Sequence, residues 1–185
     1  GGALNLVFCN TKVDCAEVAR HLQSEKIVAI ALHGDLDQAQ RNQVLVRFSN
    51  RSASVLIATD VAARGLDVKD IDGVFNYELP QQPEVYVHRI GRTGRAGKTG
   101  IAVSLVEERE MWRLQEIEKF LPDAFIQQRG IPDAKRGDKT LIPLLTTIQI
   151  SGGRKNKLRP GDFLGALTAQ GGIPGDAVGK IDLFD

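Results

Sequence analysis

The sequence contains no apolar run near the roughly 18 residues that a membrane-spanning helix requires. Its first residues also lack the basic and apolar stretches of a signal peptide. Cysteine is scarce: Cys9 and Cys15 are the only two, and their spacing fits neither a Cys-x-x-Cys site nor a disulfide framework. We therefore expect two thiols beside an apolar core, a cytoplasmic protein and no membrane partner.

An excess of charge of one sign is also absent. The chain has 24 Lys and Arg against 23 Asp and Glu, so its net charge of +1 identifies no class of partner. Any electrostatic argument must rest on local clusters of charge. With 42% hydrophobic and 25% charged residues, the 185 residues suffice for one globular domain, or for one domain and a fragment.

Over the first two thirds of the chain, short apolar runs alternate with amphipathic segments. Continuous apolar runs of four residues are typical of buried parallel strands, and apolar positions at spacings of three and four are typical of helices. Strands are predicted over 6–9, 27–32, 55–58, 74–77 and 101–106, and helices from 11 and over 37–50, 84–89 and 107–121. This alternation predicts an α/β fold, an open parallel sheet with helices on both faces, whose ligands bind beyond the carboxyl ends of the strands.

The character of the sequence changes near residue 127. Residues 128–138 are polar and contain glycine and proline, which indicates a linker. A β-α-β pattern follows: an apolar run over 147–150, a helix over 161–169 and a last segment over 179–184. About forty residues are too few for a core of their own. We expect a domain over 1–127, a linker over 128–144 and a truncated second domain over 145–185.

Residues 86–100 form a basic segment without any acid. Arginines recur there at every third position and alternate with glycines: Arg89, Arg92, Arg95, Gly91, Gly94 and Gly97. Glycine allows a polyanion to approach the backbone, and the arginine fork suits phosphate. The pattern favours a phosphate site, although any charge run can also be a solvated basic face.

This segment also contains an apparent P-loop. Gly97-Lys98-Thr99 resembles the end of such a loop, but Arg92 stands where the pattern requires a glycine. The segment also leads into a predicted strand rather than a helix. We reject the P-loop, and the chain contains neither a second candidate nor an Asp-Glu-Ala-Asp sequence.

Two other loops carry polar side chains at the ends of predicted strands. Residues 59–67 contain a hydroxyl, two carboxylates and an arginine after the strand at 55–58. Residues 33–35 read His-Gly-Asp, and Gln38 and Arg41 follow on one face of the next predicted helix. Each loop, taken alone, also fits a capped helix start with a surface turn.

Together these segments resemble the second RecA-like domain of a DEAD-box ATP-dependent RNA helicase, over about residues 4–122. The segments that match its motifs IV, Gln-x-x-Arg, IVa, V and VI are residues 6–11, 38–41, 47–48, 58–67 and 88–95. Residues 150–167 resemble the start of the RNA-binding domain of the DbpA subgroup, an RRM variant directed at large-subunit ribosomal RNA. Ile148 and Ile150 stand where an RRM usually has aromatic side chains, so the basic loop is the better candidate for RNA contact.

The resemblance implies a role for each matching residue. Arg92 and Arg95 would be catalytic arginine fingers at the γ-phosphate of ATP, and Asp67 would bind the ribose. Coupling to the other domain would involve Arg64, His88 and Arg89. RNA would contact Gly34, Arg41 and Thr59, and in the tail Arg154, Lys155, Lys157 and Arg159. No metal site is expected in this chain, since a missing N-terminal RecA-like domain would hold the Mg²⁺ that accompanies ATP.

The function implied is ATP-dependent unwinding of short RNA duplexes, in ribosomal RNA remodelling or large-subunit assembly. The two RecA-like domains would close on ATP and single-stranded RNA. The chain alone is expected to be inactive, because it lacks the phosphate-cradling loop, the magnesium carboxylate and the water-positioning base. Two alternatives stay open: a non-catalytic RNA-binding or adaptor module, and a relative of the DNA helicases.

Overall fold

The computed structural model describes residues 3–66, 68, 71–94, 99–122, 124, 126–131, 141–143 and 145–183, without the side chain of Arg154. The chain divides into two compact units, Gly1–Thr146 and Thr147–Asp185. Each unit is described by itself.

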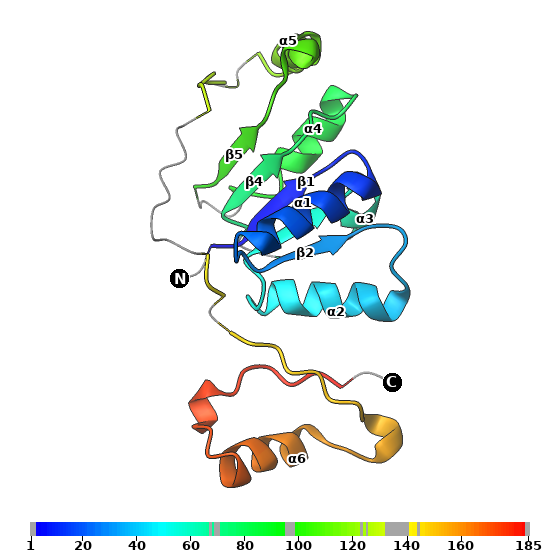
Figure 1. Ribbon diagram of the computed structural model, residues 1–185, viewed down its shortest axis with the longest axis vertical. Helices are drawn as coiled ribbons and strands as arrows, with labels where there is room; N and C mark the ends of the chain where they lie inside the picture. Colours follow the sequence, from blue (N-terminus) through cyan, green and yellow to red (C-terminus); the bar gives the residue numbers. More distant parts are fainter. Residues whose placement is uncertain are drawn as a thin grey trace. The chain divides into compact units, whose positions relative to one another are not determined.

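The first unit is built on a five-stranded parallel sheet with the strand order β2-β3-β1-β4-β5 (Figure 1). The strands are β1 (Asn5–Phe8), β2 (Ala29–Leu32), β3 (Val55–Ala58), β4 (Gly73–Asn76) and β5 (Ile101–Ser104). Phe8 is paired with both Ala58 and Asn76, so the three central strands end at the same level. The predicted open parallel sheet is confirmed, and its central carboxyl ends form one edge.

Side-chain capping sets where several helices of the first unit begin. They are α1 (Lys12–Ser24), α2 (Gln38–Ser49), α3 (Asp60–Ala63), α4 (Pro83–Ile90), the 3₁₀ turn η1 (Glu108–Glu110) and α5 (Met111–Phe120). The Thr11 hydroxyl caps α1 by accepting from the Asp14 amide at 3.2 Å. Asp37 and Gln40 form a reciprocal capping box at the start of α2. The helix predicted over 107–121 is divided, because its first turn is η1.

Helices cover both faces of the sheet, as the pleat of β3 shows. Leu56 lies in a buried cluster that includes Phe48 of α2, whereas Val55 and Ile57 lie in a second cluster with Cys15 of α1. Buried side chains of α4 and α5 form a third cluster. Successive residues of a strand point to opposite faces, so this division confirms the prediction of helices on both sides.

The two cysteines lie in the second cluster, as the sequence predicts. Both Cys9 and Cys15 are buried and free. A hydrogen bond with Cys15, together with burial, raises the pKa of the Cys9 thiol well above its ordinary value. Leu141 packs against the same cluster, and its carbonyl accepts a hydrogen bond from the Ser54 hydroxyl at 2.8 Å. This end of the predicted linker is therefore part of the first unit.

The second unit is formed around one helix. α6 (Pro160–Gly165) continues as the π-helical η3 (Ala166–Gln170), with 3₁₀ turns η2 (Arg154–Asn156) and η4 (Gly175–Ala177) on either side. The predicted helix is confirmed, but the flanking segments 147–150 and 179–183 form no strand in the described part. Two short strands by themselves offer too few ladder bonds and too small an apolar face. None of the described residues of this unit is buried.

The described helices of both units are short. None of them combines the length and the apolar composition that crossing a bilayer requires.

Candidate functional site

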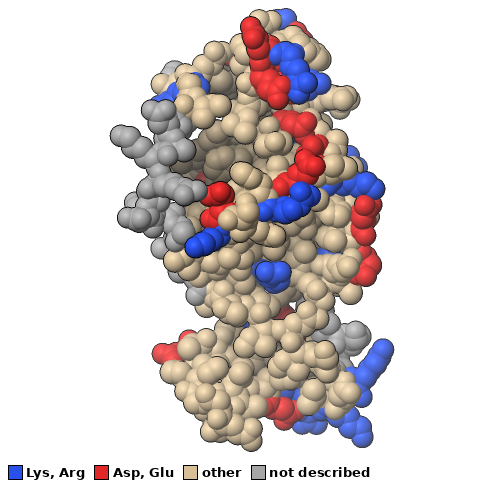
Figure 2. Space-filling view, in the orientation of Figure 1, with Lys and Arg blue, Asp and Glu red and all other residues tan. Residues whose placement is uncertain are grey.

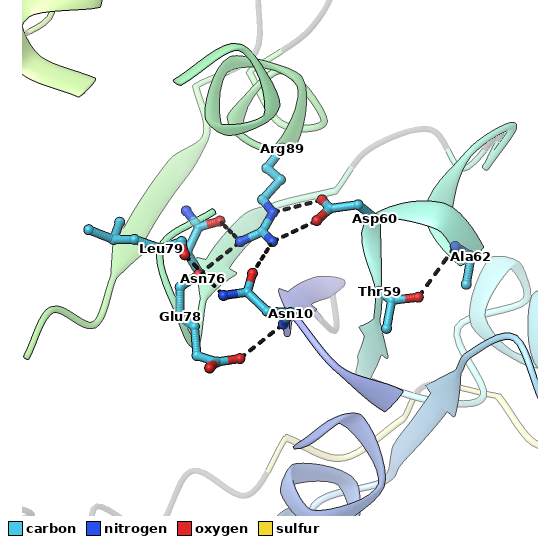
Figure 3. Close-up of polar contacts among 8 residues, drawn as sticks. All are labelled: Asn10, Thr59, Asp60, Ala62, Asn76, Glu78, Leu79 and Arg89. Atoms are coloured by element: carbon cyan, nitrogen blue, oxygen red, sulfur yellow. Dashed lines mark hydrogen bonds and ion pairs between the residues drawn. The ribbon is translucent and has the colours of Figure 1, made fainter. Parts of the chain in front are cut away.

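Polar side chains gather where the three central strands of the first unit end. Asn10 follows β1, Thr59 and Asp60 follow β3, and Asn76 is the last residue of β4. Because these parallel strands end in step, the side chains come together at one edge of the sheet (Figure 3).

Arg89 of α4 lies at the centre of this edge, and only 1% of it is exposed (Figure 3). Its Nε and Nη2 donate to the two carboxylate oxygens of Asp60, at 2.8 and 2.7 Å. Nη1 donates to Oδ1 of Asn76 at 3.2 Å and to the carbonyl of Glu78 at 2.8 Å. Nη2 also donates to Oδ1 of Asn10 at 2.8 Å. A guanidinium has five N–H groups, so every donor of Arg89 is paired inside this unit.

The surroundings of Arg89 make this pairing strong. The guanidinium carbon lies 5.1 Å from the centre of the Phe8 ring, which excludes water from one side. The Asp60 side chain is 34% exposed, so the ion pair joins a buried cation to a partly exposed carboxylate. Removing the carboxylate would leave the buried guanidinium without its counter-charge, at a cost of up to about 3–5 kcal/mol.

The one-turn helix α3 is held at both ends. The Thr59 side chain caps its start by accepting from the Ala62 amide at 3.4 Å, while Asp60 binds Arg89. At its other end, Nη2 of Arg41 donates to the Ala62 carbonyl at 2.8 Å. The capped helix start considered for this loop is therefore present. The predicted RNA residues Thr59 and Arg41 lie on either side of α3.

The arginine–glycine loop begins directly after α4. Nη1 of Arg92 donates to the carbonyl of Leu66 at 3.0 Å, and no other hydrogen-bond partner of this guanidinium occurs among the described residues. The Thr93 hydroxyl donates to the carbonyl of Ile71 at 2.5 Å. A Cβ added at Gly100 would lie 2.5 Å from the amide nitrogen of Gly94, so the loop packs closely against the start of β5.

Three other predicted site residues of the first unit lie at the surface, unlike the buried Arg89. Gly34, Arg64 and His88 are exposed. Arg89 is paired within its own unit, so direct contact of its guanidinium with another domain would require some of these bonds to break. Asp67 and Arg95 lie outside the described residues.

The predicted basic loop of the second unit is exposed. Figure 2 shows Lys and Arg side chains gathered at one end of the second unit. Over the visible face of the first unit, both signs of charge are interspersed. Lys155, Lys157 and Arg159 are exposed, and the side chain of Arg154 lies outside the described part. The amides of Asn156 and Leu158 both donate to the Gly153 carbonyl, which closes the loop.

Four polar residues of the edge were not predicted as site residues: Asn10, Asp60, Asn76 and Glu78. The signal that could have found them is an amide side chain at the carboxyl end of a continuous apolar run, where Asn10 and Asn76 stand. No group of three or more His, Cys, Asp or Glu side chains in the described part could hold a metal ion. A hollow of about 410 Å³ between α1 and strands β4 and β5 contains none of the predicted site residues.

The two units match two different family models. Residues 2–97 match the helicase conserved C-terminal domain, and residues 147–185 match the DbpA RNA binding domain. The ATP-dependent RNA helicase DbpA of Escherichia coli (strain K12) is 50% identical over 176 residues, which are 95% of this chain. The chain spans 38% of the length of that relative.

Solved structures give the same assignment. E. coli DEAD-box protein SrmB, bound to regulator of ribonuclease activity A, is 33% identical with a TM-score of 0.63, over 80% of this chain and 84% of that one. Saccharomyces cerevisiae Dbp5, bound to RNA and ADP BeF3, is 35% identical with a TM-score of 0.63, over 67% of this chain and 34% of that one. The chain therefore belongs to the DEAD-box ATP-dependent RNA helicases, as their conserved C-terminal helicase domain of RecA-like fold, followed by residues of a DbpA RNA-binding domain.

Proposed function

We propose that this chain is the second half of the catalytic core of an enzyme that unwinds short RNA duplexes at the expense of ATP. The observation that carries the proposal is the position of Arg92. Its guanidinium is held in the loop after α4 by the Leu66 carbonyl, and among the described residues its other donors have no partner and can bind phosphate. Mere RNA binding does not require an arginine that is positioned in this way.

The nucleotide would bind between the loop after α4 and the N-terminal RecA-like domain. ATP, when bound with Mg²⁺, supplies the phosphoryl group that is transferred to water. Arg92 fits that group, since a fixed guanidinium neutralises the charge that develops on it. Such arginine fingers are worth about 10³–10⁵ in rate. By family resemblance, Arg95 is the second finger, Asp67 binds the ribose, and the other domain holds the metal.

Coupling between the two RecA-like domains would use the exposed side chains beside Arg92. Arg64 and His88 are exposed and follow α3 or lie within α4, so they can reach the other domain directly. The buried Arg89 would support coupling from within this unit.

We propose that the chain comprises a domain over 1–127, a linker over 128–144 and a second, partial domain over 145–185.

RNA would bind through its backbone along the carboxyl edge of the sheet. Gly34 presents an exposed backbone, Arg41 a guanidinium and Thr59 a hydroxyl. Contacts with phosphates and sugars carry no base information, so this part would bind RNA of any sequence. The structure of the relative Dbp5 with RNA and ADP BeF3 supports this proposal.

The second unit would direct the enzyme to its target. Arg154, Lys155, Lys157 and Arg159 would contact RNA phosphates, because basic side chains on an exposed loop release counterions on binding. The resemblance of this unit to the DbpA RNA-binding domain favours ribosomal RNA, in remodelling or large-subunit assembly in the cytoplasm.

The test is phosphate release by the longer protein that contains this chain, measured with RNA, with DNA of the same sequence and without nucleic acid. We expect hydrolysis that RNA stimulates and DNA does not, and no hydrolysis by residues 1–185 alone. Equal stimulation by DNA would favour a DNA helicase. RNA binding without any RNA-stimulated hydrolysis would favour a non-catalytic RNA-binding or adaptor module.

A further inference from the structure

We propose that Arg89 is a positioning residue that joins the RNA-facing loop to the phosphate-facing loop, so that the two move as one body. This inference rests on the proposed function. It assigns Arg89 a task inside this unit, where its five donors are paired, rather than a direct contact across the domain boundary.

Two cross-links connect the same pair of chain segments. The first segment, 59–66, contains Thr59 and α3, and the second, 89–92, ends α4. Arg89 binds Asp60 at the start of the first segment, and Arg92 binds the carbonyl of Leu66 at its end. One link would leave the segments free to pivot, whereas two links fix both their separation and their angle. A displacement of Thr59 therefore displaces Arg92.

The remaining bonds of Arg89 anchor this pair to the sheet. Asn10 follows β1, Asn76 is the last residue of β4, and Glu78 follows that strand. Arg89 thus binds the ends of three neighbouring strands at one point (Figure 3). Its burial over Phe8 makes any partly broken arrangement costly, since an unpaired donor would face no water.

The shape of the side chain is essential to this task. The bidentate contact with Asp60 uses the planar fork of the guanidinium. A lysine keeps the charge but has three donors on one nitrogen, so it cannot reproduce the fork. Arg89→Lys therefore separates charge from geometry, and Asp60→Asn weakens the same link from the other side while it keeps one oxygen acceptor.

The experiment is a double-mutant cycle in the longer protein with Arg89→Lys, Asp60→Asn and both together. Hydrolysis is measured with and without RNA, alongside KM for ATP and affinity for RNA. We expect each single variant to lose RNA stimulation about tenfold or more, with RNA-independent hydrolysis and KM for ATP changed less than about threefold. The double variant should be no worse than the poorer single variant. Arg113→Lys on α5, which alters an ion pair with Glu110 of η1, should have no effect.

Two results would overturn the inference. Losses that multiply in the double variant would show that Arg89 and Asp60 act separately. An equal loss of RNA-stimulated and RNA-independent hydrolysis would show a purely structural role. If Arg89→Lys fails to fold, the milder Asp60→Asn decides by the same ratio. Absence of RNA-stimulated hydrolysis in the wild type contradicts the proposed function instead.

Hydrogen exchange tests the joining without reference to activity. In the wild-type chain, the amides of 60–66 and 89–92 should open with a common rate. In Asp60→Asn the two segments should open at rates that differ by about tenfold. Separate opening already in the wild type would contradict the inference.

Discussion

The two units of the chain differ in what holds their functional side chains. In the first unit, buried clusters cover both faces of a sheet, and the central Arg89 is 1% exposed with every donor paired. In the second unit no described residue is buried, and Lys155, Lys157 and Arg159 are exposed. We propose that chemistry that depends on geometry, such as neutralising charge on a phosphoryl group, takes place on the unit with a core. Contact with a polyanion requires charge more than position, and an exposed loop provides it.

The largest expected effect is a difference in stability between matched substitutions in the two units. Leu56→Ala removes a fully buried side chain of β3, and the free energy of unfolding should fall by about 2–5 kcal/mol. Leu164→Ala alters a side chain of α6 that is 41% exposed, and the change should stay within about 0.5 kcal/mol.

Urea titration of both variants and the wild type measures these changes. The slope of the unfolding free energy against urea should be the same for the three proteins, so that the midpoints alone report stability. A large loss in Leu164→Ala would show a core in the second unit and would remove the contrast.

A smaller effect is expected at the arginine–glycine loop. Thr93→Val deletes the hydroxyl that binds the Ile71 carbonyl, and this leaves an acceptor unpaired at a cost of about 1–3 kcal/mol. We expect RNA-stimulated kcat of the longer protein to fall about tenfold because the loop with Arg92 loses its anchor. Thr93→Ser keeps the hydroxyl and should retain most of the rate. Equal rates for the valine and serine variants would exclude this anchoring.

The smallest effect concerns the exposed charges of the second unit. Replacing Lys155, Lys157 and Arg159 by alanine should leave stability and maximal turnover unchanged. The dependence of RNA affinity on salt should weaken by about 2 in its logarithmic slope, at about 0.7 for each phosphate contact with single strands. Affinity is measured by fluorescence anisotropy at several salt concentrations. An unchanged slope would mean that this loop does not bind phosphates.

Local signals in the sequence were enough to predict most of the first unit. The four-residue apolar run at Val55–Ala58 became the buried strand β3, and Thr11 and Asp37 cap the helices that they were expected to begin. These features depend on residues close together in the chain. The carboxyl edge of the sheet could also be predicted as the place of the candidate site, because ligands of open parallel sheets bind beyond the carboxyl ends of the strands.

Features that depend on distant contacts could not be predicted in this way. Arg89 binds Asn10 across 79 positions and Asp60 across 29, and nothing local distinguishes this arginine from Arg92. The helix α3 has four residues, too few for a periodic pattern to appear. In the second unit, a β-α-β pattern predicted strands at 147–150 and 179–184, but a strand also needs neighbours with which to pair.

The most direct test of the account is RNA-stimulated ATP hydrolysis by the longer protein with Arg92→Ala, with Arg113→Ala on α5 as the control. We expect turnover to fall by about 10³-fold or more, with RNA affinity within about threefold of the wild type and the control unchanged. Unchanged turnover in Arg92→Ala would contradict the account, since the loop after α4 would then be a basic surface without a role at the phosphate.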